Sequence, residues 1–118
     1  MLVYVLDSTK NSIIYHAINR PGDNFVVDAA GSVEVALASI FKKPYDLIVL
    51  SQTSGRTSVY DLAEEIKHTK LKKAPSIAIV DDNPTVTARL ASTLRGRSVF
   101  TFNFSQLDKL SDLIQEAR

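Results

Sequence analysis

The chain has 118 residues, of which 45% are hydrophobic and 23% charged, as is ordinary for one globular domain in water. The net charge is only +1, which argues against partners such as nucleic acid or an anionic membrane. There is no cysteine, which excludes disulfides and thiol catalysis. The apolar start at residues 1–6 is far shorter than the ~20 residues that cross a membrane. We therefore expect a single cytoplasmic domain over residues 1–118.

The apolar spacing alternates between a strand pattern and a helix pattern along the chain. We expect these elements in chain order: strand 1–6, helix 9–19, strand 25–27, helix 33–41, strand 46–50, helix 59–66, strand 76–80, helix 84–94, strand 98–102 and helix 105–118. The 46–50 strand contains an unbroken apolar run, LIVL. Such a short run is typical of a strand that is buried on both faces at the centre of a parallel sheet.

Capping residues mark the starts of three of these helices. Ser32 is a favourable N-cap for the second helix. Ser58, with Asp61 three residues later, resembles a capping box for the third. Asn83 followed by Pro84 is a typical start for the fourth. Five strands that alternate with five helices predict an α/β fold, with a doubly wound parallel sheet in the order 2-1-3-4-5 and helices on both faces.

Two segments resemble the receiver domain of two-component response regulators. Residues 43–50 (KPYDLIVL) are similar to the receivers' approach to their phosphoacceptor strand. Residues 104–110 (FSQLDKL) are similar to the segment after the receivers' Lys-Pro pair. The resemblance covers essentially the whole chain. It implies a flavodoxin-like (CheY-like) fold and a role in signal transduction.

The same resemblance places the receivers' reactive positions on side chains that lack their chemistry. The phosphoacceptor aspartate falls on Ser51, which carries no charge and needs a base to become a nucleophile. Of the acid pair that binds Mg²⁺, only Asp7 remains, although Mg²⁺ sites usually need more than one anionic oxygen. The hydroxyl position falls on Val80 and the lysine position on Phe102. We therefore expect a pseudo-receiver that is not phosphorylated at Ser51, is not an enzyme, and uses no metal or cofactor.

One alternative is a receiver with a rebuilt acidic site. Asp81 and Asp82 follow the fourth strand, at the same edge of the sheet as Asp7 and Ser51. Three carboxylates at one crevice could bind a cation or supply an unusual phosphoacceptor. The start of the fourth helix also accounts for Asp81 and Asp82, because negative charge is favourable there.

A second alternative is a small-ligand sensor at the loop after residue 50. Hydroxyls and a glycine before a helix start can hold a phosphate. The residues concerned are Ser51, Thr53, Ser54, Gly55 and Thr57. A phosphate-bearing or aromatic molecule would bind there. A polar surface turn that ends at the Ser58 cap explains the same residues.

The resemblance also implies a partner surface, made in receivers by the fourth helix, the fifth strand and the last helix. The candidate residues on it are Arg89, Arg97, Val99 and Phe100. The partner would be another protein or a second copy of the chain, and an output domain could be fused beyond residue 118. Phe100 alternates with Phe102 and Phe104, so the strand pattern places all three on one face, where we expect them to pack in the core.

Overall fold

The computed structural model describes residues 2–7, 9, 12–19, 26–51, 58–69, 71 and 74–116. Within these ranges, five strands alternate with five α-helices. The strands are β1 (Leu2–Leu6), β2 (Val26–Ala30), β3 (Leu47–Ser51), β4 (Ser76–Val80) and β5 (Val99–Phe102). The helices are α1 (Ile13–Ile18), α2 (Val33–Ser39), α3 (Val59–His68), α4 (Pro84–Thr93) and α5 (Leu107–Glu116), and the short 3-10 helix η2 (Phe104–Gln106) leads into α5.

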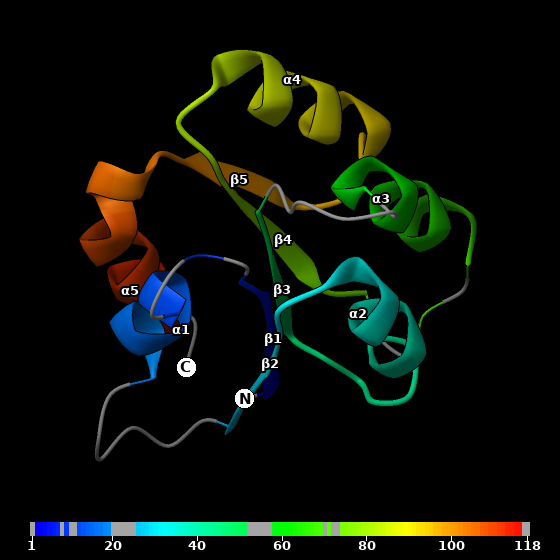
Figure 1. Ribbon diagram of the computed structural model, residues 1–118, viewed down its shortest axis with the longest axis horizontal. Helices are drawn as coiled ribbons and strands as arrows, with labels where there is room; N and C mark the ends of the chain where they lie inside the picture. Colours follow the sequence, from blue (N-terminus) through cyan, green and yellow to red (C-terminus); the bar gives the residue numbers. More distant parts are fainter. Residues whose placement is uncertain are drawn as a thin grey trace.

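The strands form one sheet in the order β2-β1-β3-β4-β5, and every neighbouring pair is parallel. Helices α1 and α5 cover one face of the sheet, and α2, α3 and α4 cover the other (Figure 1). The predicted α/β class and the flavodoxin-like strand order are confirmed. This order places β1, β3 and β4 inside the sheet and leaves β2 and β5 at its edges.

The core has two layers, one on each face of the sheet. Alternate side chains of a strand point to opposite faces, so every central strand contributes to both layers. Ile48 and Leu50 of β3 join the layer under α2, α3 and α4, whereas Val49 joins the layer under α1 and α5. The apolar run at residues 47–50 is buried, as predicted, and the strand continues through Ser51, which is buried too. β3 is therefore enclosed on both faces up to its end at Ser51.

The three predicted helix caps are present. The Ser32 hydroxyl accepts a hydrogen bond from the Val35 amide. Ser58 and Asp61 form a reciprocal capping box at the start of α3. The Asn83 side chain accepts from the Thr85 amide. Each cap satisfies amides that the first turn of a helix leaves without a partner.

Helix α1 is shorter than the apolar spacing predicted, since it begins at Ile13 instead of near residue 9. Ser12 has a left-handed backbone, with φ of 51°. The Thr9 hydroxyl accepts from the Ile13 amide at 2.9 Å, and Asp7 accepts from the Tyr15 amide at 2.9 Å. Side chains that precede the helix thus bind the amides of its first turn. Helical spacing alone does not reveal such an irregular entry.

The prediction that three phenylalanines share one buried face was wrong for Phe100. Phe102 and Phe104 pack against the core layer under α1 and α5. Phe100 is 38% exposed. Phe100 and Phe102 do share a face of β5, but the core layer under α1 and α5 reaches Phe102 and does not reach Phe100. In the described part of the chain, no helix has the length and apolarity needed to cross a membrane.

Candidate functional site at the carboxyl edge of the sheet

The structure brings five predicted pocket residues to one edge of the sheet, namely Asp7, Ser51, Val80, Asp81 and Phe102. In the parallel register, Ser51 lies beside Val80, and Val80 lies beside Phe102. Asp7 directly follows β1, and its amide donates to the carbonyl of Ala30 at 2.8 Å. Asp81 directly follows β4, and its amide donates to the Phe102 carbonyl at 3.0 Å. Ligands of open α/β sheets bind outside this carboxyl edge, so its side chains decide what chemistry is available.

Ser51 is enclosed and its hydroxyl is already bonded. The residue is 1% exposed, and Oγ donates to the Leu6 carbonyl at 2.8 Å. A peptide carbonyl is not a base that could remove the hydroxyl proton, so the contact does not activate the oxygen as a nucleophile. The bond instead ties the end of β3 to the end of β1. The contact of Ser51 is therefore structural.

Asp7 is also bound within the fold. It is 6% exposed, and its Oδ1 accepts from the amide and the hydroxyl of Thr9. Its Oδ2 accepts from the Tyr15 amide at 2.9 Å. Both carboxylate oxygens thus hold the entry to α1. A cation at Asp7 would have to compete with three hydrogen bonds, each of them assisted by the carboxylate charge.

Val80 and Phe102 supply no polar group at this edge. Val80 is fully buried, and Phe102 packs against the same core layer. Here two apolar side chains close the space between β4, β5 and α5.

Asp81 and Asp82 shape the turn that leads into α4. Asp81 Oδ1 accepts from the Asn83 amide at 2.8 Å. Asp82 Oδ1 accepts from the Phe104 amide at 2.8 Å and so joins this turn to the start of η2. Asp82 thereby links two connections that are far apart in the sequence. Among the side chains that the structure describes, no three His, Asp or Glu gather closely enough to hold a metal ion.

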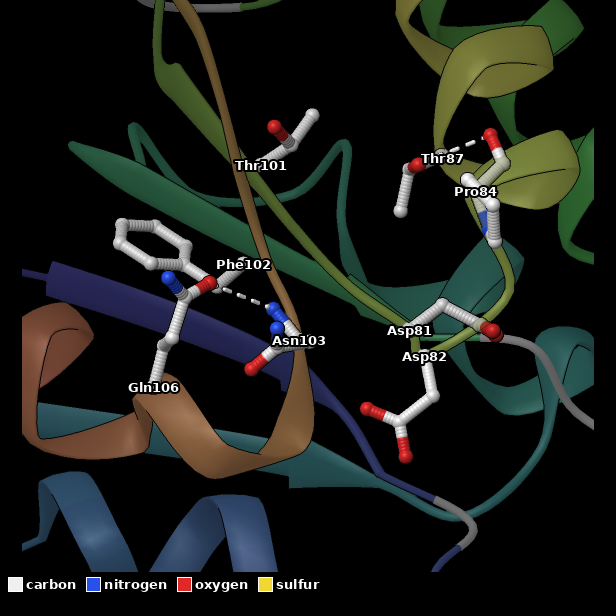
Figure 2. A pocket seen from close by; sticks show the side chains of 8 residues that line it. All are labelled: Asp81, Asp82, Pro84, Thr87, Thr101, Phe102, Asn103 and Gln106. Carbon is white, nitrogen blue, oxygen red and sulfur yellow. Dashed lines mark hydrogen bonds between the residues drawn. The ribbon is translucent and has the colours of Figure 1, made fainter.

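A pocket of about 210 Å³ lies beside these two acids, between the start of α4 and the end of β5 (Figure 2). Its lining residues are Asp81, Asp82, Pro84, Thr87, Thr101, Phe102, Asn103 and Gln106. Ligand pockets usually measure about 300–1,000 Å³, so this one suits a single side chain of a partner better than a whole cofactor. The two carboxylates make the pocket acidic, which disfavours a phosphate.

The sequence did not single out Thr87, Thr101 or Gln106 as site residues. The strand period does contain a signal for Thr101, because it must point to the opposite face from Phe102 and hence toward α4. Figure 2 shows their side chains on opposite sides of β5. Gln106 is held beside the pocket because its Oε1 accepts a hydrogen bond from the Asn103 amide at 3.0 Å. Thr53, Ser54, Gly55 and Thr57 of the predicted anion loop lie outside the described residues.

Two of the predicted partner-surface residues contact α3. The Arg89 guanidinium lies over the Tyr60 ring, 3.9 Å from its centroid. Arg97 Nη2 donates to the Ile66 carbonyl at 2.8 Å. Both arginines therefore fasten α4 and its exit to α3. Val99 is half-buried against the core. Phe100 is the remaining member of the predicted set, and its side chain is 38% exposed.

The comparisons with known proteins assign the chain to no family. The chain matches no protein-family model, and no curated protein matches it at a significant level.

Proposed function

We propose that this chain is a receiver-like signalling domain that acts in the cytoplasm through protein–protein contact and without phosphorylation at Ser51. The strand order and the loss of receiver chemistry at the carboxyl edge support the proposal. The observation that carries it is the state of Ser51 and Asp7. Both are enclosed, and both are hydrogen-bonded to groups of the fold itself. A domain that has the receiver-like fold but no working phosphoacceptor would transmit a signal through contacts at its surface. Fold alone does not fix function, so the proposal depends on this site.

The proposed contact surface is the side made by α4, β5 and α5, with Phe100 at its exposed centre. Arg89 and Arg97 would act there indirectly, because their contacts with α3 hold α4 in place. The pocket beside Asp81 and Asp82 opens next to this surface and would accept a basic side chain of the partner. The partner is another protein or a second copy of the chain.

The test is an amide NMR spectrum recorded before and after addition of Mg²⁺ with beryllofluoride, which mimics an aspartyl phosphate. We expect no shift at Asp7, Ser51, Asp81 or Asp82. Shifts at these residues that spread to Phe100 would instead support the alternative of a rebuilt acidic site. A stoichiometric phosphodonor adduct that is stable to acid and labile to base would contradict the proposal directly.

A ligand sensor remains the second hypothesis, now without support from the described pocket. The predicted ligand carries a phosphate or an aromatic group, whereas the pocket at the carboxyl edge is small and acidic. Inorganic phosphate that raised the melting temperature of the protein would favour this hypothesis, because a ligand stabilises the state that binds it.

A further inference from the structure

A second pocket lies on the face covered by α2, near the end of the sheet opposite to Ser51. It has a volume of about 320 Å³ and sits between β1, β2 and the connection from α2 to β3. Its lining residues are Tyr4, Asp28, Ala29, Ser39, Lys42, Lys43 and Tyr45. This volume falls within the usual range of small-molecule sites, about 300–1,000 Å³. None of these residues takes part in the function proposed above.

Asp28 gives the pocket a fixed negative charge. Its Oδ2 accepts from the Tyr45 hydroxyl at 2.7 Å and from Lys43 Nζ at 3.1 Å. The hydrogen bond from Tyr45 lowers the pKa of Asp28, and the bond and charge of Lys43 act in the same direction. Burial raises the pKa of Tyr45, and its bond to Asp28 raises it further, so the hydroxyl keeps its proton. Oδ1 of Asp28 makes no hydrogen bond to any residue that the structure describes.

Two aromatic rings form the apolar wall of the pocket. Tyr4 and Tyr45 meet edge to face, with ring centroids 5.1 Å apart and an interplanar angle of 75°. Both residues are buried, with 2% of Tyr4 and 4% of Tyr45 exposed, so only a small part of each ring faces the pocket. The Asp28 bond and the ring contact hold Tyr45 from two sides. The wall is therefore formed before any ligand arrives, which limits the entropy that binding costs.

Lys42 supplies a positive charge at the rim of the pocket. Lys43 is paired with Asp28. No ion pair joins the exposed Lys42 to another described residue. Lys43 offsets the charge of Asp28 but leaves its Oδ1 without a described bond, so a ligand with only a negative charge would meet Lys42 and leave Oδ1 unsatisfied. A ligand with only a positive charge would bond to Oδ1 but would be repelled by Lys42 and Lys43. A ligand with both charges satisfies both groups.

We propose that this pocket binds a free amino acid, with its ammonium at Asp28 Oδ1, its carboxylate at Lys42 Nζ and its side chain against the Tyr4 and Tyr45 rings. The proposal is independent of the phosphorylation-free signalling role, because it uses other residues at the other end of the sheet. A domain that carried both features would combine a metabolite site with a contact surface.

Tyrosine fluorescence is a direct readout, since the protein has four tyrosines and no tryptophan, and two of the tyrosines line the pocket. The titration uses free leucine, phenylalanine and glutamate, together with their N-acetyl and amide derivatives. We expect a saturable change with at least one free amino acid. The N-acetyl form loses the ammonium and the amide form loses the carboxylate. Each derivative should bind about tenfold or more weakly, because each loses one charge-assisted hydrogen bond.

Two variants test the two charges separately. Asp28→Asn and Lys42→Gln should each weaken binding about tenfold. Their controls, Asp112→Asn and Lys67→Gln, make the same changes on exposed positions of α5 and α3 and should leave the affinity unchanged. Lys42 is exposed, so its variant keeps the assay decisive even if Asp28→Asn fails to fold. The proposal is overturned if no free amino acid binds at millimolar concentration, if the blocked derivatives bind equally well, or if the control variants weaken binding as much.

Discussion

The two corners of the carboxyl edge contain similar polar residues but differ in what those residues are free to do. At the corner of β1 and β3, Asp7 and Ser51 are buried and bonded within the fold. At the corner of β4 and β5, Asp81 and Asp82 border an open pocket. An acid or a hydroxyl at the end of a parallel strand is thus not by itself a reactive group. Its hydrogen-bond partners and its burial decide whether it can react.

The order of the strands explains this difference. β1 and β3 are neighbours inside the sheet, and the amides of Thr9 and Tyr15 bond to the two oxygens of Asp7 at the end of β1. β5 is an edge strand, and only one neighbour flanks it. The turn after β4 and the start of η2 are held together by Asp82 alone among the side-chain bonds described there. The first corner is therefore closed and the second remains accessible.

The largest effect is expected where the closed corner is forced to accept a charge. Ser51→Asp would place a carboxylate at a position that is 1% exposed and next to the Leu6 carbonyl. We expect a loss of about 3 kcal/mol in the free energy of unfolding at neutral pH, because the buried charge has no partner. Urea denaturation measures it. Ser51→Ala, which removes one hydrogen bond, should cost only about 1–2 kcal/mol.

The pH dependence of this variant has a defined sign. Burial raises the pKa of the introduced carboxyl in the folded state above its value in the unfolded chain. The folded state then binds more protons than the unfolded state. The part of the destabilisation that comes from the charge is therefore absent at acid pH and grows as the pH rises from the unfolded pKa to the folded pKa. A Ser51→Asp protein that is as stable as the wild type at neutral pH, and that takes up beryllofluoride, would show that this corner is open after all.

The second effect concerns the acid of the closed corner. Asp7→Asn leaves one oxygen to accept hydrogen bonds, whereas the carboxylate accepts three with two oxygens. We expect a loss of about 2 kcal/mol in the free energy of unfolding, because hydrogen bonds to a charged group are lost or weakened. The control is Asp112→Asn on the exposed side of α5, which should change stability by less than about 0.5 kcal/mol. Equal effects of the two substitutions would mean that Asp7 does not hold the entry to α1.

Local sequence rules predicted the parts of this comparison that depend on local contacts. The buried β3 strand follows from its apolar run, and the caps at Ser32, Ser58 and Asn83 follow from residue type and spacing. The sheet order followed from the alternation of strands and helices. These features involve neighbours in the sequence or a general rule of chain connection. The sequence alone was therefore sufficient for them.

The features that were missed depend on residues far apart in the chain. The bond from Ser51 to Leu6 spans 45 positions, and the bond from Arg97 to Ile66 spans 31. Spacing patterns do not report which side chain lies across a helix interface. The sequence therefore did not reveal that Arg97 also bonds to the last turn of α3. The same limit applies to Phe100, whose exposure depends on how far the core layer under α1 and α5 extends along β5 and not on its alternation with Phe102.

A smaller effect is expected for the matched acid of the open corner. Asp82→Asn retains an oxygen that can accept from the Phe104 amide, and the side chain is exposed to water. The free energy of unfolding should fall by less than about 1 kcal/mol. The amide signal of Phe104 in an NMR spectrum should shift, since its acceptor changes from a charged to a neutral group. A loss as large as that of Asp7→Asn would remove the distinction between the two corners.

The last effect is expected on binding more than on stability, and it concerns Phe100. Phe100→Ser should lower the free energy of unfolding by about 1–2 kcal/mol, because the side chain is 38% exposed and the rest of its surface is buried. The matched control is Val35→Ser on α2, where an apolar side chain is 52% exposed on the other face of the sheet. Self-association is measured by light scattering, and partner binding by capture on immobilised protein.

Under the proposed function, Phe100→Ser abolishes the association that is found and Val35→Ser leaves it intact. A central aromatic side chain often contributes a large share of the binding energy of an interface, whereas scattered exposed apolar residues need no partner. The reverse result would move the contact surface to α2. Equal loss in both variants would indicate non-specific apolar association. Because neither substitution is expected to unfold the domain, the pair separates contact from stability in a way that the buried residues of the closed corner do not allow.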